Sequence, residues 1–200
     1  MNPLGPLVSR LAAEGVTYAP EIVGAARKYG LDPQLLAAVA AQETGGPGAN
    51  GGRNEVGDGG HGRGLFQIDD RWHDFAKSAA AMDPAQNADY AAGMLSGLLR
   101  RYNGNVREAL SAYNAGDPHA QGTRTTWGDG ESLDYADSVM RHYQQLGGNS
   151  PQLDQLAMAR PQAPPLQAPL HAPRAHHHAH RPPVHQAMSY DSYINGGDNP

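Results

Sequence analysis

Residues 32–47 have the sequence DPQLLAAVAAQETGGP, which predicts a helix with recognisable ends. Asp32 can cap the first turn with its side chain, and Pro33 suits the first helical position, where a backbone N–H is not needed. The apolar side chains that follow at helical spacing are Leu35, Leu36, Val39 and Ala40. Two glycines and a proline then end the helix.

Glu43 stands near the end of this helix, four residues after Val39 and seven after Leu36. These spacings place its carboxyl group on the apolar face. Burial and the negative end of the helix dipole both disfavour the charged form, so we expect the pKa of Glu43 to be raised. A raised pKa suits a general acid that works near neutral pH. The alternative is a salt bridge between Glu43 and Arg53 or Arg63.

Further helices are predicted on both sides of this one, because capping residues precede and glycines follow several apolar-periodic segments. The expected helices begin at Pro20, Asp83-Pro84 and Asn105, with a last one around Tyr135 to Gly147. Alanine supplies 31 of the 200 residues, which favours close-packed helices over a β-sandwich. The predicted fold class is mainly α, of the α+β type because of the insert that follows residue 44.

This insert, residues 45–64, contains ten glycines in twenty positions. That is too many for a helix interior, so we expect a loop or small β-hairpins, followed by a strand or buried turn at 65–68. The insert and the residues after it carry Asp58 and Asp69. Glycines let the backbone approach a ligand closely, and polar loops around a buried carboxyl group suit a carbohydrate cleft.

Two carboxyl groups near a third suggest glycoside cleavage. One protonated carboxyl group gives its proton to the leaving oxygen, and an inverting enzyme has a second, ionised one roughly 6.5–9.5 Å away that holds a water. Either Asp58 or Asp69 could hold that water. The alternative is that these loop aspartates form turns, and Asp58-Gly59 fits such a turn.

Composition divides the chain into three predicted parts. Seven prolines and six of the ten histidines fall between residues 161 and 185, where apolar surface is too sparse to offset the entropy of ordering. We expect an N-terminal extension over 1–16, a catalytic domain over 17–148 and a flexible Pro/His/Ala-rich tail over 149–200. The imidazoles of residues 176–180 could bind a metal ion or the tail could dock a partner; a low-complexity linker or an engineered tag is the alternative.

Charge, cysteine content and hydropathy exclude several classes of protein. A net charge of −5 gives no electrostatic footprint for nucleic acid. The absence of cysteine excludes disulfides and zinc–thiolate sites, and no phosphate-binding, dinucleotide or metalloprotease motif is present, so no cofactor or catalytic metal is expected. No apolar run is long enough to span a membrane, and the first residues lack the features of a secretory signal.

Several short motifs occur together in an order shared by a known family. Glu43 at a helix end, GLFQ at 64–67 and AYNAG at 112–116 resemble soluble lytic transglycosylases and goose-type lysozymes. Three more segments resemble the goose-type branch: GDGGHGRG at 57–64, IDDRWH at 68–73 and DYADSV at 134–139. The resemblance implies a lysozyme-like fold in which the glycine-rich insert borders a cleft for peptidoglycan glycan strands.

The resemblance also implies roles for individual residues. Glu43 would be the general acid of a muramidase that cleaves the β-1,4 bond between MurNAc and GlcNAc, with Asp69 and Asp58 positioning the attacking water for inverting hydrolysis. The residues implied to line the saccharide cleft are Gln67, His73, Tyr113, Asn114 and Tyr135, and Tyr135 would approach the catalytic carboxyl group.

Two alternatives to hydrolysis are open. In a lytic transglycosylase Glu43 acts as acid and then base, and the C6 hydroxyl of MurNAc replaces water, which leaves a 1,6-anhydro end. A non-catalytic wall-binding or virion structural module would keep the cleft without turnover. The lack of cysteine and the acidic charge fit a bacterial or phage origin, and we expect a monomer. Made in the cytoplasm, it would reach the periplasm or cell wall through a holin, a virion or a dedicated secretion route.

Overall fold

The computed structural model describes residues 5–149, so the predicted tail and its histidines lie outside the described residues. Its α-helices are α1 (Gly5–Ala13), α2 (Ala19–Lys28), α3 (Pro33–Ala40), α4 (Pro84–Arg101), α5 (Val106–Ala115) and α6 (Tyr135–Gln145). An antiparallel sheet has the order β1 (Glu55–Gly57), β2 (Gly62–Gly64) and β3 (Ile68–Asp69), and a hairpin joins β4 (Thr125–Thr126) to β5 (Ser132–Leu133). The predicted fold class, mainly helical with a small β insert, is confirmed.

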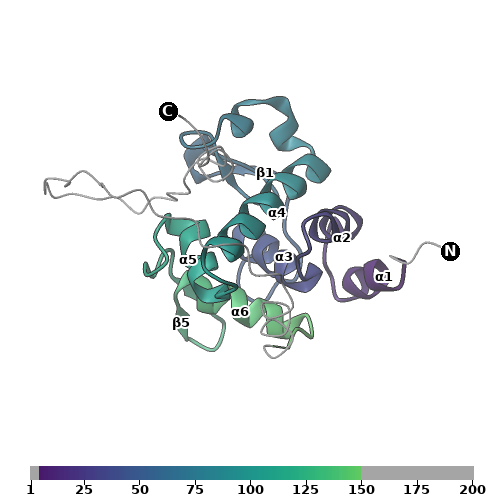
Figure 1. Ribbon diagram of the computed structural model, residues 1–200. Helices are drawn as coiled ribbons and strands as arrows, with labels where there is room; N and C mark the ends of the chain where they lie inside the picture. Colours follow the sequence, from purple (N-terminus) through teal and green to yellow (C-terminus); the bar gives the residue numbers. More distant parts are fainter. Residues whose placement is uncertain (1–4, 150–200) are drawn as a thin grey trace, which may run out of the picture.

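Helix α4 connects two ends of the molecule (Figure 1). The sheet end comprises β1 to β3 with three short 3-10 turns, η2 (Asp58–Gly60), η3 (Asp74–Lys77) and η4 (Ala79–Met82). The helical end comprises α5, α6 and the β4–β5 hairpin. Helix α4 packs against α2 and α5, and α3 packs against α6. The chain between α3 and α4, which forms the sheet end, is the glycine-rich insert and the residues that follow it.

Side-chain caps fix where the helices start. Asp32, Asp83 and Asn105 each accept a hydrogen bond from a backbone N–H in the first turn of α3, α4 and α5. Asp134 caps α6 in the same way. Each such cap contributes about 1 kcal/mol. The helix starts that were predicted at Asp32, Asp83 and Asn105 are therefore confirmed.

Helix α3 lies in the middle of the core. Every residue from Gln34 to Ala40 is buried, and Leu36 and Val39 are fully enclosed. Three of its eight residues are alanine, and such small side chains let neighbouring helices approach closely. The segment that follows α3, which carries Glu43, is therefore held from inside the domain rather than from a surface loop.

The structure adds features that the sequence did not indicate. Helix α1 lies within the expected N-terminal extension, and its Leu11 is fully buried in the common core. The turns η3 and η4 occupy residues for which no element was predicted. Among residues 5–149, none of the helices has both the length and the apolar character needed to cross a bilayer.

Candidate active site

Glu43 lies on a π-helical turn. Helix α3 continues into η1 (Ala41–Gly45), where the backbone is wound more widely than in an α-helix, and Gly46 ends this turn with φ of 89°. Single π-helical turns are rare in proteins, and those that occur are often found at functional sites. The sequence predicted an ordinary last helical turn here, so the position of Glu43 is confirmed as helical but the local winding differs.

A pocket at the junction of the core and the sheet end brings several predicted site residues together. Its lining consists of Glu43, Phe66, Gln67, Ile68, Asp69, His73, Met94 and Tyr113. The cavity volume is about 20 Å³, which is room for about one water molecule. Five of the eight residues predicted for the site therefore share one pocket, and they come from η1, the sheet end and α5.

Tyr135 holds the Glu43 carboxyl group from the helical end. Its hydroxyl donates to Glu43 Oε1 at 2.6 Å, and the Tyr135 side chain is almost fully buried. Burial, with the nearby charge of Glu43 adding to it, raises the pKa of Tyr135 and of Tyr113 well above the ordinary tyrosine value. Both phenols therefore stay neutral, and that of Tyr135 remains able to donate to Glu43 near neutral pH.

The arginines considered as alternative partners of Glu43 bind other carboxylates. Arg53 Nη2 lies 3.0 Å from Glu55 Oε1, and Arg63 Nη2 lies 2.9 Å from Asp70 Oδ2. These two guanidinium groups are thus engaged within the sheet end.

Arg71 joins the two aspartates that were predicted to position water. It binds Asp69 through its backbone N–H and side chain, with Nε 2.9 Å from Oδ1 and Nη2 2.5 Å from Oδ2, and its Nη2 also binds Asp58. Asp69 is buried, whereas Asp58 is exposed and has a positive φ of 47°. Asp58 is not among the residues that line the pocket. It is connected to the pocket through Arg71 and Asp69.

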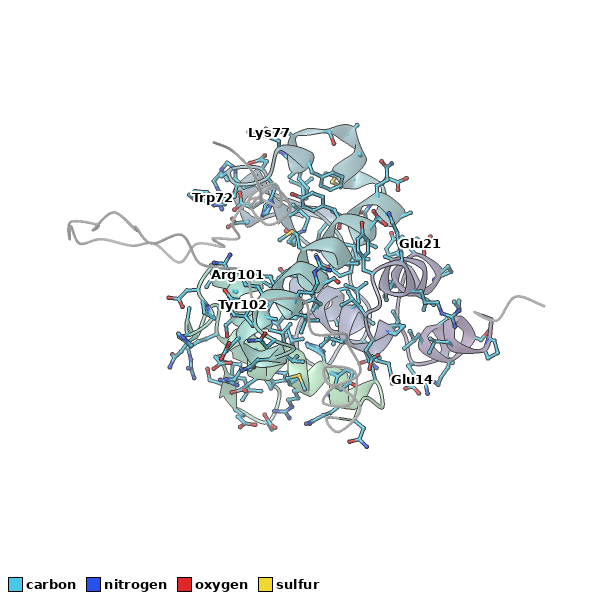
Figure 2. The ribbon with its side chains drawn as sticks, viewed as in Figure 1. Glu14, Glu21, Trp72, Lys77, Arg101 and Tyr102 are labelled. Atoms are coloured by element: carbon cyan, nitrogen blue, oxygen red, sulfur yellow. The ribbon has the colours of Figure 1, made fainter. Side chains whose placement is uncertain are left out.

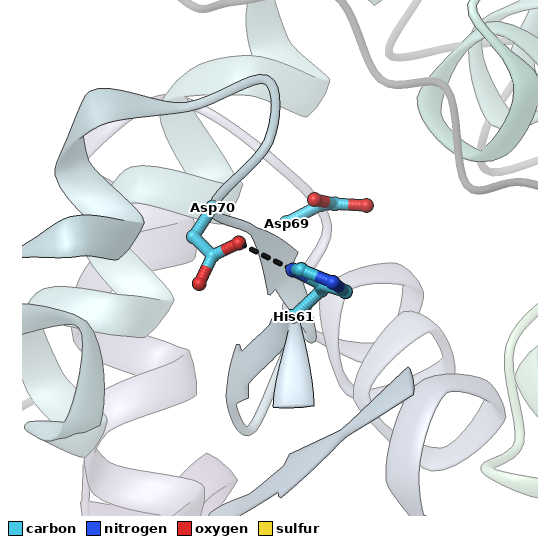
Figure 3. Close-up of side chains that lie close together, drawn as sticks. All are labelled: His61, Asp69 and Asp70. Atoms are coloured by element: carbon cyan, nitrogen blue, oxygen red, sulfur yellow. Dashed lines mark hydrogen bonds and ion pairs between the residues drawn. The ribbon is translucent and has the colours of Figure 1, made fainter. Parts of the chain in front are cut away.

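His61 and Asp70 lie beside the ion pairs that Arg71 makes with Asp69 and Asp58 (Figure 3). His61 Nδ1 lies 2.8 Å from Asp70 Oδ1. Potential metal-ligating atoms of His61, Asp69 and Asp70 all lie within 4.8 Å of one another. Because Asp69 already binds Arg71 and Asp70 already binds Arg63, two arginines compensate the negative charge that would attract a cation.

Gln67 depends on the glycines of the insert. Its Nε2 donates to the carbonyl oxygens of Gly64 at 2.8 Å and Glu55 at 3.1 Å, and its backbone has a positive φ of 47°. A Cβ atom on Gly57 or Gly62 would lie 2.2 or 2.3 Å from Gln67 Oε1. These two glycines therefore provide the space in which the Gln67 amide lies against the sheet.

His73 and Asn114 differ in how closely they approach the pocket. His73 is buried in its lining, and its Nδ1 lies 2.9 Å from the Tyr90 hydroxyl. Asn114 is buried as well, but it is outside the lining, and its Oδ1 accepts a hydrogen bond from the backbone N–H of Thr123 at 2.9 Å. The described contacts of Asn114 thus hold the loop after α5.

Three residues that line the pocket, Phe66, Ile68 and Met94, were not among the predicted site residues, and neither was Arg71 beside it. Met94 of α4 lines the pocket, but its helical spacing looks the same as that of a core residue. Arg71 stands two residues after Asp69, and this opposite-charge spacing was the available signal for their ion pair. The neighbouring Trp72 is 40% exposed and lies at the surface of the sheet end (Figure 2).

Comparisons with known proteins identify the family of the chain. The sequence pattern of the family described as "Transglycosylase SLT domain" matches residues 21–131, which contain Glu43 and every residue of the pocket. A protein named "Transglycosylase" from Enterobacteria phage PRD1 is 35% identical over 132 residues. That match covers 65% of this chain and 44% of the relative, so the chain spans less than half of that protein. The match to the family pattern covers more than half of the chain, and the chain therefore belongs to the transglycosylase SLT domain family.

Proposed function

We propose that this protein cleaves the glycan strands of peptidoglycan at the β-1,4 bond between MurNAc and GlcNAc, with Glu43 as the proton donor. The observation that carries the proposal is the Glu43 carboxyl group itself, which borders a pocket and accepts a hydrogen bond from a buried tyrosine. Membership of the SLT family and the name of the phage relative support the same substrate and bond.

The route that the geometry supports best is lytic transglycosylation. Protonated Glu43 gives its proton to the glycosidic oxygen, and the bond from that oxygen to C1 of MurNAc breaks. The C6 hydroxyl of the same MurNAc then bonds to C1 and returns a proton to the Glu43 carboxylate. The products are a 1,6-anhydro-MurNAc end and a GlcNAc with a free 4-hydroxyl group, and Glu43 is again protonated.

The state of Asp69 supports this route over hydrolysis. A carboxylate has about four lone-pair sites, and three N–H groups of Arg71 engage both oxygens of Asp69. The backbone N–H binds Oδ1, Nη2 binds Oδ2, and Nε is shared between the two oxygens. Little acceptor capacity is left on Asp69 for an attacking water. Asp58 binds the same guanidinium group and lies outside the pocket lining, so it is no better placed than Asp69 to position an attacking water.

Inverting hydrolysis is the second candidate, and one observation favours it. Asp69 and Glu43 border the same pocket, whose volume suits one water molecule. If Arg71 moved away when a glycan strand bound, Asp69 could hold that water as the carboxylate opposite the acid.

The products distinguish the two routes. Purified sacculi are digested, the muropeptides are reduced with borohydride, and their masses are measured. Transglycosylation gives ends that are lighter than hydrolysis products by one water molecule and that borohydride does not reduce. Hydrolysis gives reducing ends that gain two hydrogens.

The same assay tests the acid. Glu43→Gln keeps the size and hydrogen-bonding capacity of the side chain but cannot deliver a proton, so we expect release of muropeptides to stop while the fold is retained. Wild-type protein that binds sacculi without releasing muropeptides would contradict the proposal and support a non-catalytic wall-binding module instead.

A further inference from the structure

Two neighbouring residues of the π-helical turn are bound by one face of α6. Tyr135 and Ser138 stand three residues apart on this helix and therefore lie on the same side. The Tyr135 hydroxyl donates to Glu43 at 2.6 Å, and Ser138 Oγ lies 2.5 Å from Gln42 Oε1. The side chains of Gln42 and Glu43 thus meet α6 through two adjacent hydrogen bonds.

The bond to Gln42 belongs to a chain of hydrogen bonds between α6 and the β4–β5 hairpin. Trp127 Nε1, which can only donate, gives its hydrogen to Ser138 Oγ at 3.0 Å. The Ser138 hydroxyl then donates to Gln42 Oε1, and Gln42 Nε2 donates to Thr125 Oγ1 at 2.8 Å. The indole of Trp127, the Ser138 hydroxyl and the Gln42 amide are thus joined in one series of donors and acceptors that ends on Thr125.

Burial makes this chain costly to disturb. Ser138 is fully buried and Trp127 is 4% exposed. A buried polar group that loses its partner retains the penalty of desolvation, so each of these groups favours the arrangement in which all are paired. The chain therefore acts on Gln42 as a defined anchor between α6 and the β4–β5 hairpin.

Thr44 supplies a second anchor, on the other side of Glu43. Its Oγ1 lies 3.1 Å from the carbonyl oxygen of Leu65 and accepts from the backbone N–H of Arg53 at 2.8 Å. Three consecutive side chains are thus bound by different parts of the fold: Gln42 by α6 and the hairpin, Glu43 by Tyr135, and Thr44 by the sheet end. Any rotation of η1 about its axis would break at least one of these contacts.

We propose that Gln42 and Ser138 are positioning residues for Glu43. By holding η1 in one rotational setting against α6, they keep the Glu43 carboxyl group beside Tyr135 and directed at the pocket. Neither residue lines the pocket, so their effect is transmitted through the backbone of η1. The inference rests on the proposed role of Glu43 as the acid.

The test removes each partner of the hydrogen bond between Ser138 and Gln42 in turn and compares the variants with a matched control. Ser138→Ala and Gln42→Leu each delete the contact, and the double variant tests whether they act as one unit. Ser96→Ala is the control, because Ser96 is another fully buried helical serine and donates to the carbonyl oxygen of Tyr29 at 3.1 Å. All variants are assayed on soluble glycan oligomers, alongside wild type and Glu43→Gln.

We expect kcat to fall about tenfold in Ser138→Ala and in Gln42→Leu, with KM within about twofold of wild type, because a misplaced catalytic group slows chemistry more than binding. The double variant should be no slower than the slower single variant, and Ser96→Ala should keep the wild-type kcat. The inference would be overturned if Ser138→Ala kept the wild-type kcat, as Ser96→Ala is expected to do. If wild type cleaves and Glu43→Gln does not in the same assay, the proposed function would remain intact.

A second measurement does not depend on activity. Hydrogen–deuterium exchange of a peptide covering residues 41–45 should be about tenfold faster in Ser138→Ala and Gln42→Leu than in wild type, and unchanged in Ser96→Ala. Unchanged exchange in the first two variants would show that this pair does not hold η1. If wild type failed to cleave glycans, the proposed function would fail, and the exchange result would still decide the role of the pair.

Discussion

The Tyr135 hydroxyl donates to Glu43 Oε1 at 2.6 Å across a sequence separation of 92 residues. Tyr135 is the first residue of α6, and Asp134 caps this helix by accepting from the backbone N–H of Asp137. Arg107 of α5 binds Asp134 at 2.6 Å. The orientation of the Glu43 carboxyl group is therefore set by the start of a helix that is itself bound to α5.

Removing this hydroxyl should impair catalysis and stability together. Tyr135→Phe deletes a hydrogen bond between a buried phenol and a carboxyl group, which is worth about 1–3 kcal/mol of unfolding free energy. We expect kcat on soluble glycan oligomers to fall about tenfold, because the carboxyl group is no longer oriented.

A second buried tyrosine provides the control for that variant. The Tyr143 hydroxyl lies 2.8 Å from Asp32 Oδ2, and the side chain is fully buried. Tyr143→Phe should lower the unfolding free energy by a similar amount in urea denaturation and leave kcat unchanged. Similar kcat values for the two variants would contradict the role assigned to Tyr135.

Arg71 should matter more for stability than an exposed arginine. Arg71→Ala leaves Asp69, which is 3% exposed, without its guanidinium partner, and depriving a buried acceptor of its partner costs about 1–3 kcal/mol. Arg71→Lys keeps the charge but loses the planar fork, so we expect an intermediate loss. Arg53→Ala removes only an exposed pair with Glu55 and should leave the midpoint of urea denaturation nearly unchanged. Urea denaturation at pH 7 measures all three.

A side chain at Gly57 should displace the Gln67 amide. In Gly57→Ala the new Cβ atom would lie 2.2 Å from Gln67 Oε1, so this amide must move and its hydrogen bonds to the carbonyl oxygens of Glu55 and Gly64 are disturbed, at a cost of about 1 kcal/mol. Gly24→Ala is the control, because Gly24 is in α2 with no atom within 4 Å of the added Cβ. That change should stabilise the protein by about 0.5–1 kcal/mol. In thermal unfolding we expect Tm to fall in Gly57→Ala and to rise in Gly24→Ala. If Tm fell in both variants, the steric explanation would be contradicted.

The unfolding free energy should fall as the pH is lowered from 6.5 to about 4. Burial lowers the pKa of His142 to about 4, and the charge of Arg141 acts in the same direction. An unfolded histidine has a pKa of about 6.5, so between these values the unfolded chain binds a proton that the folded chain does not. The contribution is complete above pH 6.5, and its loss reaches at most about 3 kcal/mol near pH 4.

His142→Gln isolates this contribution. The variant should lose the part of the pH dependence that lies between pH 6.5 and about 4, whereas a variant of the exposed His119, His119→Gln, should keep it. Urea denaturation at half-unit pH intervals measures the slope. A wild-type slope in His142→Gln would assign the dependence to other groups.

Much of the fold could be predicted because its signals are local. Asp32, Asp83 and Asn105 cap helices that begin at the next residue, and each cap depends only on its own first turn. The β4–β5 hairpin was missed, although Asp129-Gly130 is a turn signal that could have indicated it. The π-helical winding of residues 41–45 has no such signal, because it depends on how Gln42 and Thr44 are bound by distant segments.

The candidate site could be predicted less completely, because its contacts are long-range. The spacing of Glu43 from Leu36 indicated a carboxyl group facing the interior, and the family resemblance implied the approach of Tyr135. Neither could show that Arg71 binds Asp58 and Asp69 at once, since that depends on how the sheet end folds back on itself. The placement of Asn114 outside the pocket lining likewise depends on the loop that Thr123 belongs to.

The anchoring of residues 42–44 also constrains how the enzyme can move. If the two ends of the molecule open to admit a glycan strand, the hinge axis must pass near this turn, because its side chains are bonded to both ends. Atoms on a hinge axis travel least. The Glu43 carboxyl group would then stay almost stationary while the other residues that line the pocket move around it.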